Sequence, residues 1–181
     1  PSEQAAHVYD TLVKAGEAYG LRHAGLKALA SLRMEKGYRD YGHDMDNTDN
    51  VFEAGLGFAV DLHKPGGFIG RDAVVKQKAG GSLKRRLVQV LLQDPEPMMF
   101  HAEIVRRDGT AVGYIRAASY GHTLGGAVGL AMIEAGEPAS ASVDAAYLSS
   151  GNWEVEIANK LYPAVLSLKP MYDPEMKKIR A

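Results

Sequence analysis

The sequence predicts an α+β fold in which a region of helices and loops precedes a small antiparallel β-barrel or sandwich. Apolar residues recur at helical spacing near the N-terminus, whereas short β-rich runs separated by turn residues fill residues 85 to 170. The 181 residues are 46% hydrophobic and 24% charged, so the chain is long enough to bury a large core without a metal or a disulfide. We expect a boundary between about residues 78 and 84 and divide the chain into residues 1–80 and 81–181.

The N-terminal residues are expected to form two helices. Apolar side chains at helical spacing predict the first over about residues 3 to 18, with Ser2 as a candidate N-cap and Gly20 as a candidate C′ residue. A second, shorter helical pattern runs from Ala24 to Ala30.

The pattern then changes to one of strand, loop and helix. Leu32 and Met34 alternate with polar neighbours, which predicts a half-buried strand. Residues Gly37 to Asn50 are rich in Tyr, Gly, Asp and Asn, which favours an ordered loop and makes this the first candidate functional segment. A third helix is expected between Gly70 and Gly80.

Residues 81–181 are expected to hold five or six short antiparallel strands. Asp108 and Gly109 form the turn of a predicted hairpin, and close packing of strands accounts for the glycines from Gly125 to Gly129. The β-rich runs are RRLVQVLL, AEIVRRDGTAVGYI, AVGLAMI and WEVEIANKLYPAVLSL.

Composition excludes several classes of function. With 21 basic and 22 acidic residues the net charge is -1, too balanced for a protein that reads nucleic acid by neutralising phosphates. There are no cysteines, so disulfide scaffolds, thiolate metal sites and cysteine nucleophiles are excluded. Apolar stretches such as Val128 to Ile133 are far shorter than the roughly 18 residues of a membrane span, so no membrane partner is expected.

The motifs that could carry chemistry are weak. The segment HDMDNTDN resembles a calcium loop, but its sixth position is Asp49 and its twelfth is Gly55, so turn formation is the better interpretation. Ser119 lacks the leading Gly of a nucleophile elbow, and the six histidines show no metal-ligand spacing. The basic cluster from Lys84 to Leu87 is able to bind a carboxylate or phosphate, although such runs are usually solvated.

A longer pattern resembles a known family. Residues 31 to 60, SLRMEKGYRDYGHDMDNTDNVFEAGLGFAV, are followed in order by FIGRDAVVKQK, KRRLVQV, DGTAVGYI and SYGHTLGGAVGLAMI. This series resembles the aminomethyltransferase family, which comprises the glycine-cleavage T-protein and the folate-binding C-terminal regions of FAD-dependent dimethylglycine and sarcosine dehydrogenases. The resemblance covers nearly the whole chain and implies the tail of a folate-binding α+β domain followed by a small antiparallel β-barrel.

Two details favour the dehydrogenases within that family. T-proteins tend to show TSG and SPTL where this chain has RAASYGHTLG, Arg116 to Gly125, and EKGYR followed by EAGLGFAV is closer to the flavin-linked enzymes. The resemblance then implies oxidation of a methylated glycine at FAD in an N-terminal domain, capture of the carbon by tetrahydrofolate as methylenetetrahydrofolate, and a bacterial cytoplasmic or mitochondrial matrix location. Alternatives are the T-protein itself, with a lipoyl carrier protein as partner, and a non-catalytic folate-binding or regulatory module of the same fold.

Candidate ligand-binding residues follow from the chemistry of a pterin. Its donor edge suits a carboxylate, its flat face suits tyrosine stacking, and the glutamate tail of a folate suits basic residues. On that basis Tyr41, Glu53, Tyr120 and His122 are candidate contacts for tetrahydrofolate. An equally good interpretation of Glu53 is that it caps the start of a helix.

The chain also departs from the family pattern. In the family the catalytic Asp and a pterin-reading Glu lie in a segment that would precede Pro1, and an Arg stands where this chain has Leu29. We therefore expect no catalytic residue and no flavin site in these residues. A polypeptide of these residues alone is expected to be inactive and to bind folate weakly at best.

Overall fold

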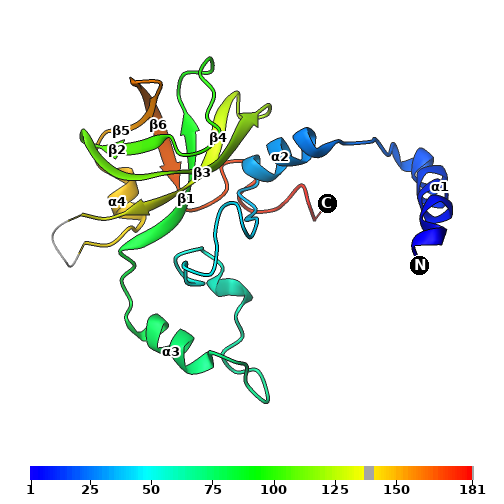
Figure 1. Ribbon diagram of the computed structural model, residues 1–181, viewed down its shortest axis with the longest axis horizontal. Coiled ribbons are helices and arrows are strands. Elements are labelled where there is room, and N and C mark those ends of the chain that lie inside the picture. The colour runs from blue at the N-terminus through cyan, green and yellow to red at the C-terminus, as the bar shows by residue number, and fades with distance from the viewer. Residues whose placement is uncertain (137–140, 181) are drawn as a thin grey trace.

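Six antiparallel strands close into a barrel that carries most of the buried apolar side chains (Figure 1). The computed structural model describes residues 1–136 and 141–180. Around the barrel the strands run in the order β1, β4, β3, β2, β5, β6, and β6 returns to β1. Because the last strand pairs with the first, the fold is the closed barrel and not the sandwich that the sequence left open. The strands are β1 (Arg85–Leu92), β2 (Ile104–Arg107), β3 (Thr110–Gly121), β4 (Gly126–Glu134), β5 (Trp153–Ile157) and β6 (Lys160–Ser167).

Most local signals for the barrel are confirmed. The exception is Gly125, where a Cβ atom would meet nothing within 4 Å and a φ of 79° indicates a turn rather than close strand packing. Asp108 and Gly109 join β2 to β3 with φ values of 50° and 80°, the left-handed pair that a two-residue hairpin turn requires. At Gly129 a Cβ atom would lie 2.9 Å from the carbonyl oxygen of Ala117 and from Cβ of Ala118. A side chain at residue 129 would therefore push β3 and β4 apart.

Apolar side chains are buried on both faces of the β1–β4 pair. Inside the barrel, Val88 and Val90 of β1 pack with side chains from the other strands. On the outer face, Leu87, Leu130 and Met132 pack against Met34, a residue of the preceding helix. The barrel therefore has two apolar surfaces, and the outer one requires a cover.

That cover is α2 (Leu26–Glu35), and it corrects one prediction. The strand expected at Leu32 and Met34 is wrong, because the helix continues without a break to Glu35. Met34 is buried together with Ser31 and Glu35, whereas Leu32 is 58% exposed. Positions i, i+3 and i+4 share one face of a helix, so this burial pattern has helical and not strand periodicity.

Polar side chains attach α2 to the turn between β3 and β4. The Glu35 carboxylate, 2% exposed, accepts the backbone N–H groups of Thr123 (2.6 Å) and Leu124 (2.9 Å). One turn earlier, the hydroxyl of Ser31 donates to the carbonyl of Tyr120 at 2.6 Å. The Glu35 bonds give an acceptor to two N–H groups of the turn, and the Ser31 bond attaches α2 to the end of β3.

A buried amide joins the end of α2 to β1 and to the C-terminal tail. Nε2 of Gln89 donates to the carbonyls of Met34 (2.6 Å) and Glu35 (3.0 Å), and its Oε1 accepts the N–H of Met171 at 2.6 Å. The last carbonyls of a helix have no partner within the helix, so Gln89 supplies one. Three segments distant in sequence are thereby held at one point.

Lys36 secures the tail a second time. Its Nζ donates to the carbonyl of Asp173 (2.8 Å) and forms an ion pair with the Asp173 carboxylate (3.3 Å). Burial opposes ionisation of that carboxyl, but hydrogen bonds from the Lys178 and Lys177 N–H groups and from Lys36 hold the pKa of Asp173 below its usual value.

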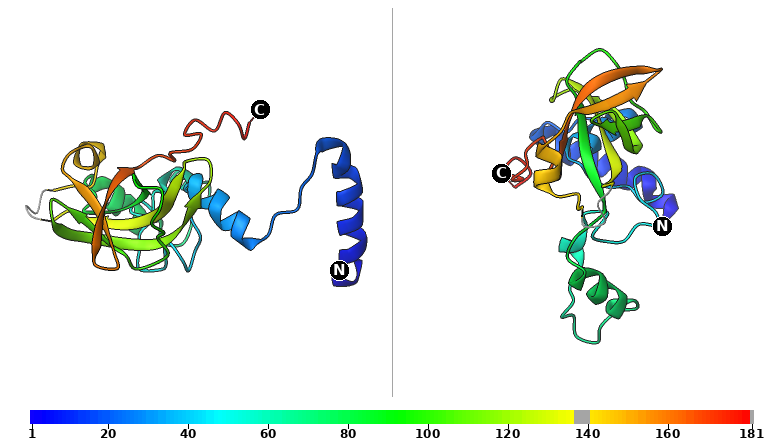
Figure 2. Two further views of the ribbon diagram at one scale, coloured as in Figure 1. Left: turned by 90° about the horizontal axis from the view of Figure 1, so that it is seen from above. Right: turned by 90° about the vertical axis from the view of Figure 1, so that its left-hand side faces the viewer.

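The first helix, α1 (Ala5–Gly16), extends away from the barrel (Figure 2). Short 3-10 turns precede and follow it, so the predicted helix is confirmed, and Gly20 ends this segment with φ 69° as expected. The N-cap prediction is wrong, because Ser2 lies inside the first 3-10 turn and its side chain makes no capping bond. None of the α1 residues is buried.

The remaining helices are short. The predicted third helix is confirmed as α3 (Arg71–Ala79), which follows Gly70 with φ 85°. The sequence did not reveal α4 (Ala145–Ser149), whose first turn is capped by the carboxylate of Asp144. In the described ranges no helix has the length and apolar character that crossing a membrane requires. The division of the chain at residue 80 stays a prediction.

Glu35→Ala should destabilise the fold, because it removes the buried carboxylate that accepts two N–H groups of the β3–β4 turn. We expect a loss of roughly 1.5–3 kcal/mol of unfolding free energy, the usual contribution of a hydrogen bond to a charged group. Glu35→Gln is the matched control, since its amide oxygen still accepts. Urea denaturation of the three proteins measures the difference, and equal midpoints for the alanine and glutamine variants would contradict this role.

Asp173→Asn should remove a pH-dependent part of the stability. Because the folded-state pKa of Asp173 is lowered, its contribution is present above the unfolded pKa of about 3.9 and is lost as the pH falls through the folded value. The variant should melt below the wild type near neutral pH and match it in strong acid. Glu175→Gln, in the same tail, is the control. A melting difference independent of pH would exclude this explanation.

Candidate functional site

Two adjacent hollows lie between α2 and β3, and together they are called the α2 groove. Their volumes are about 830 Å³ and 550 Å³, within the range of small-molecule sites. Both are lined by Ala30, Phe100 and Ala118, so they share one wall. The charged residues that line the larger hollow are Arg33, Arg39, Asp40 and Arg116, beside Leu26, Leu29 and His43. The smaller hollow is further lined by Lys27, Ser31, Leu32, Glu35, Met98, Tyr120 and His122.

One wall of the groove is apolar and open. Leu29 is 57% exposed and Phe100 is 67% exposed, although both side chains are large and apolar. In the smaller hollow the rings of Tyr120 and His122 lie with their centroids 5.2 Å apart. The groove therefore presents flat and apolar surfaces to a ligand.

The other wall is cationic, and Arg33 is its most firmly held member. Arg33 forms an ion pair with Asp44, whose side chain is 0% exposed, and donates to the carbonyl of Tyr38 at 2.9 Å. Asp44 also accepts the N–H of Asp40 at 2.7 Å. The loop after α2 therefore wraps around one guanidinium group, which fixes that group at the edge of the groove.

Arg39 is held by backbone groups. Its Nε donates to the carbonyl of Ala54 at 3.1 Å. Burial lowers the pKa of Arg39, and the charge of Arg86 lowers it further, while Asp44 acts in the opposite direction. The position of this cation is thus fixed by the surrounding loop.

Arg116 enters the groove from β3. Its partner is Asp49, a fully buried carboxylate that lies 2.9 Å from the guanidinium of Arg85 and 3.5 Å from that of Arg116.

The turn predicted for the acidic loop is confirmed. Asp46 accepts hydrogen bonds from both the N–H and the hydroxyl of Thr48, and these bonds lower the pKa of Asp46.

The structure brings together two of the four predicted ligand contacts. Tyr120 and His122 line the smaller hollow, whereas Tyr41 is 67% exposed in the loop after α2 and Glu53 lines neither hollow. The Glu53 carboxylate accepts the N–H of Asn50 at 3.0 Å, and Asn50 accepts the N–H of Glu53 at 2.9 Å, which is a capping box. The role of all four residues in folate binding stays a prediction.

Sequence reasoning missed the cationic wall and Phe100. Arg33, Arg39 and Arg116 come from a helix, a loop and a strand, so no local pattern joins them. Phe100 lies between β1 and β2, outside any periodic run. The one sequence feature that could have pointed to this wall is the segment of residues 31 to 60 that resembles the family, because it contains Arg33 and Arg39.

Comparison with known proteins identifies the family. The GCVT N-terminal domain matches residues 1–64, and the glycine cleavage T-protein C-terminal barrel domain matches residues 85–173. The chain is 42% identical over 179 residues to the 4-methylaminobutanoate oxidase (formaldehyde-forming) of Paenarthrobacter nicotinovorans, covering 99% of this chain and 20% of that protein. It is 35% identical over 180 residues to human mitochondrial sarcosine dehydrogenase, covering 99% and 19%.

A solved structure supports the fold. The crystal structure of glycine cleavage system aminomethyltransferase T from Bartonella henselae superposes with a TM-score of 0.75 at 18% identity, covering 96% of this chain and 45% of that chain. The chain spans about a fifth of the length of these two relatives, the oxidase and the sarcosine dehydrogenase. The two family domains match the chain in order, and the fold has helices followed by an antiparallel barrel. The chain therefore belongs to the aminomethyltransferase, or glycine-cleavage T-protein, family.

Proposed function

We propose that the α2 groove forms part of a tetrahydrofolate site in an FAD-dependent dehydrogenase that acts on a methylated amino acid. Two relatives carry names that describe oxidation of N-methylated amino acids, and one of those names includes formaldehyde as a product. In this proposal the one-carbon unit leaves as methylenetetrahydrofolate. The protein would act in the bacterial cytoplasm or the mitochondrial matrix.

One observation carries the proposal: the groove combines guanidinium groups with an apolar and aromatic wall. A folate has flat rings joined to a glutamate whose carboxylates are ionised. Leu29 and Phe100 offer surface to the rings, Tyr120 and His122 add aromatic faces, and Arg116 offers charge to a carboxylate. The residues present therefore fit this ligand.

The proposed role of this chain is to bind and orient. Tetrahydrofolate would itself supply the amine nitrogens that accept the carbon. Arg33 is fixed by Asp44 and Arg39 by the Ala54 carbonyl, so both cations are positioned before a ligand arrives. Such preorganisation reduces the entropy lost on binding. Proton transfer and the flavin are proposed to belong to other parts of a longer protein, whose FAD domain would be the partner of this chain.

Two substitutions in the groove should weaken tetrahydrofolate binding in the full-length protein. Tyr120→Leu removes an aromatic face worth about 1 kcal/mol, which corresponds to a several-fold rise in Kd. Leu29→Glu should raise the Kd more. The new carboxylate would repel the carboxylates of the folate and would itself pair with Arg33 and Arg39, which line the same hollow. Anaerobic calorimetry measures both constants.

The matched control is Leu161→Glu, which makes the same change at an exposed leucine of β6 and should leave the Kd unchanged. If both groove variants bind tetrahydrofolate with the wild-type Kd, the ligand does not bind in the α2 groove and the proposal is wrong. A full-length protein that binds tetrahydrofolate but holds no flavin would favour the T-protein alternative.

A further inference from the structure

Residues 170–178, which follow β6, form no helix or strand, yet they are held against the end of α2 (Figure 1). They are called the tail segment. A segment without regular structure is usually loosely held unless specific contacts fix it. Here the N–H of Met171 donates to Oε1 of Gln89 at 2.6 Å, and Nζ of Lys36 donates to the carbonyl of Asp173 at 2.8 Å. Gln89 and Lys36 are both buried, so the tail segment is fixed by buried polar contacts.

The backbone of the tail segment is folded around one carboxylate. The Asp173 side chain is 6% exposed and accepts the N–H groups of Lys177 at 2.9 Å and Lys178 at 3.2 Å. The same carboxylate pairs with Lys36 at 3.3 Å. Asp173 and Met176 have φ values of 46° and 56°, in the region that favours glycine. Such a conformation persists only where surrounding contacts enforce it, so the tail segment has one defined docked form.

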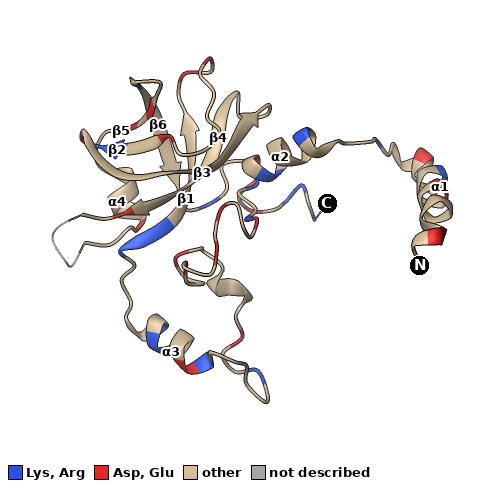
Figure 3. Cartoon of the chain, viewed as in Figure 1, with Lys and Arg blue, Asp and Glu red and all other residues tan. Residues whose placement is uncertain are grey.

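Lys36 depends on the tail segment for its partners. Within the described residues, the hydrogen bonds of its Nζ go to Tyr172 and Asp173. The tail is basic near its end (Figure 3), and Nζ of Lys178 lies 5.0 Å from the centre of the Tyr172 ring. Nζ of Lys36 lies 5.9 Å from the same ring, which attracts both cations. A buried ammonium group that loses such partners is left uncompensated.

The tail segment also approaches one cation of the α2 groove. A Cβ atom built on Gly37 would lie 3.9 Å from Cγ of Pro170 and 3.6 Å from Nη1 of Arg39. Nη1 of Arg39 also donates to the Gly37 carbonyl. The tail segment and Arg39 therefore meet at one backbone position.

The second cation, Arg33, is reached through the end of α2. Gln89, which accepts the N–H of Met171, donates to the carbonyls of Met34 (2.6 Å) and Glu35 (3.0 Å). These two residues directly follow Arg33 in the helix. The helix end that carries Arg33 is thus attached to the tail segment through a single amide.

Two states of the tail segment follow from these contacts. In the docked state it completes the set of contacts around Arg33 and Arg39. In the released state the Gln89 amide and the Lys36 ammonium group, both buried, lose these partners. Release of one irregular segment is a local opening, which requires less free energy than unfolding of the whole barrel.

We infer that docking of the tail segment and binding of a ligand in the α2 groove are coupled. The docked tail segment holds Arg33 and Arg39 in place for the anionic part of the ligand, and the bound ligand favours the docked state. The inference rests on the proposed function for the identity of the ligand, tetrahydrofolate. Asp173 and Lys36 line neither hollow of the groove, so they are positioning residues. Coupling of this kind is reciprocal, because each event strengthens the other by the same factor.

Hydrogen exchange of the full-length protein, followed by mass spectrometry, tests the coupling without any substitution. Saturating tetrahydrofolate, kept anaerobic, should slow exchange in residues 170–178 about fivefold, the lower end of typical couplings. The N–H of Asn152 is the internal control. It also donates to a carboxylate, that of Asp108 at 2.9 Å, but it lines neither hollow, so its exchange should not change.

Asp173→Ala removes the carboxylate around which the tail segment folds. This variant should raise the Kd of tetrahydrofolate about fivefold and speed exchange in residues 37–44 of the ligand-free protein. Asp173→Asn keeps an acceptor oxygen, so it should raise the Kd less. Glu175→Ala is the matched control, because this carboxylate of the tail segment is 69% exposed and pairs with the exposed Lys177. The control should change neither the Kd nor the exchange.

The inference is wrong if tetrahydrofolate binds without slowing exchange in residues 170–178, or if Asp173→Ala binds it with the wild-type Kd. The proposed function stands in both cases. If the wild type does not bind tetrahydrofolate, the proposed function is wrong instead. Exchange in the ligand-free variants then decides whether the tail segment positions the cations, and equal exchange in residues 37–44 of Asp173→Ala and Glu175→Ala would exclude it.

Discussion

The buried carboxylate of Glu35 is the contact on which the rest of the arrangement depends. It accepts two backbone N–H groups from the turn between β3 and β4 and so fixes the end of α2 on the barrel. The Gln89 amide fixes the same helix end to β1 and to the tail. The buried residues of α2 all lie in its second half, whereas Leu26 and Leu29 of the first half are exposed and line the larger hollow of the α2 groove.

Two buried carboxylates organise the cations around that groove. Asp44 holds Arg33, and Asp49 holds Arg85 together with Arg116. Removing one partner of a buried ion pair leaves the other charge uncompensated, so such pairs are firmly fixed. The acidic loop after α2 is therefore an internal scaffold for arginines: Asp44 and Asp49 are buried against them, and Asp40 is the carboxylate of this loop that lines the larger hollow. A surface that is basic and preorganised results from a chain that is nearly neutral overall.

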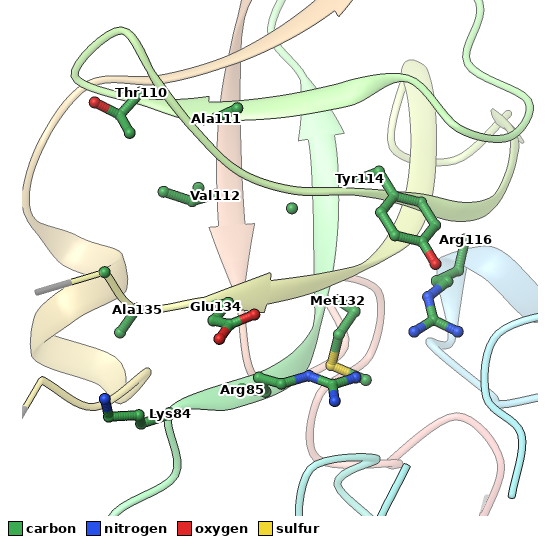
Figure 4. A pocket seen from close by; sticks show the side chains of 12 residues that line it. Lys84, Arg85, Thr110, Ala111, Val112, Tyr114, Arg116, Met132, Glu134 and Ala135 are labelled. Carbon is green, nitrogen blue, oxygen red and sulfur yellow. The ribbon is translucent and has the colours of Figure 1, made fainter. Parts of the chain in front are cut away.

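Arg116 lines two hollows, the larger hollow of the α2 groove and another between the start of β1, the end of β4 and part of β3. On the groove side, Arg116 adds charge to a wall that otherwise offers Leu29 and Phe100. On the other side it begins a line of cations that continues through Arg85 to Lys84 (Figure 4). The β-bulge at Arg116 makes the shared position possible, because a regular strand would direct this side chain differently.

The sequence by itself determined the barrel strands, the Asp108–Gly109 turn, the turns of the acidic loop and the family, since each rests on local spacing or on an ordered series of motifs. It failed at Leu32 and Met34, where alternation suggested a strand. Only the tertiary structure decided that α2 reaches Glu35. Its carboxylate accepts N–H groups from residues 88 and 89 positions further along the chain, a contact that no local pattern encodes. The same holds for the cationic wall. Periodicity reports the hydrogen bonds that a segment makes with itself, whereas the convergence of Arg33, Arg39 and Arg116 depends on closure of the barrel and on buried carboxylates that no local pattern encodes.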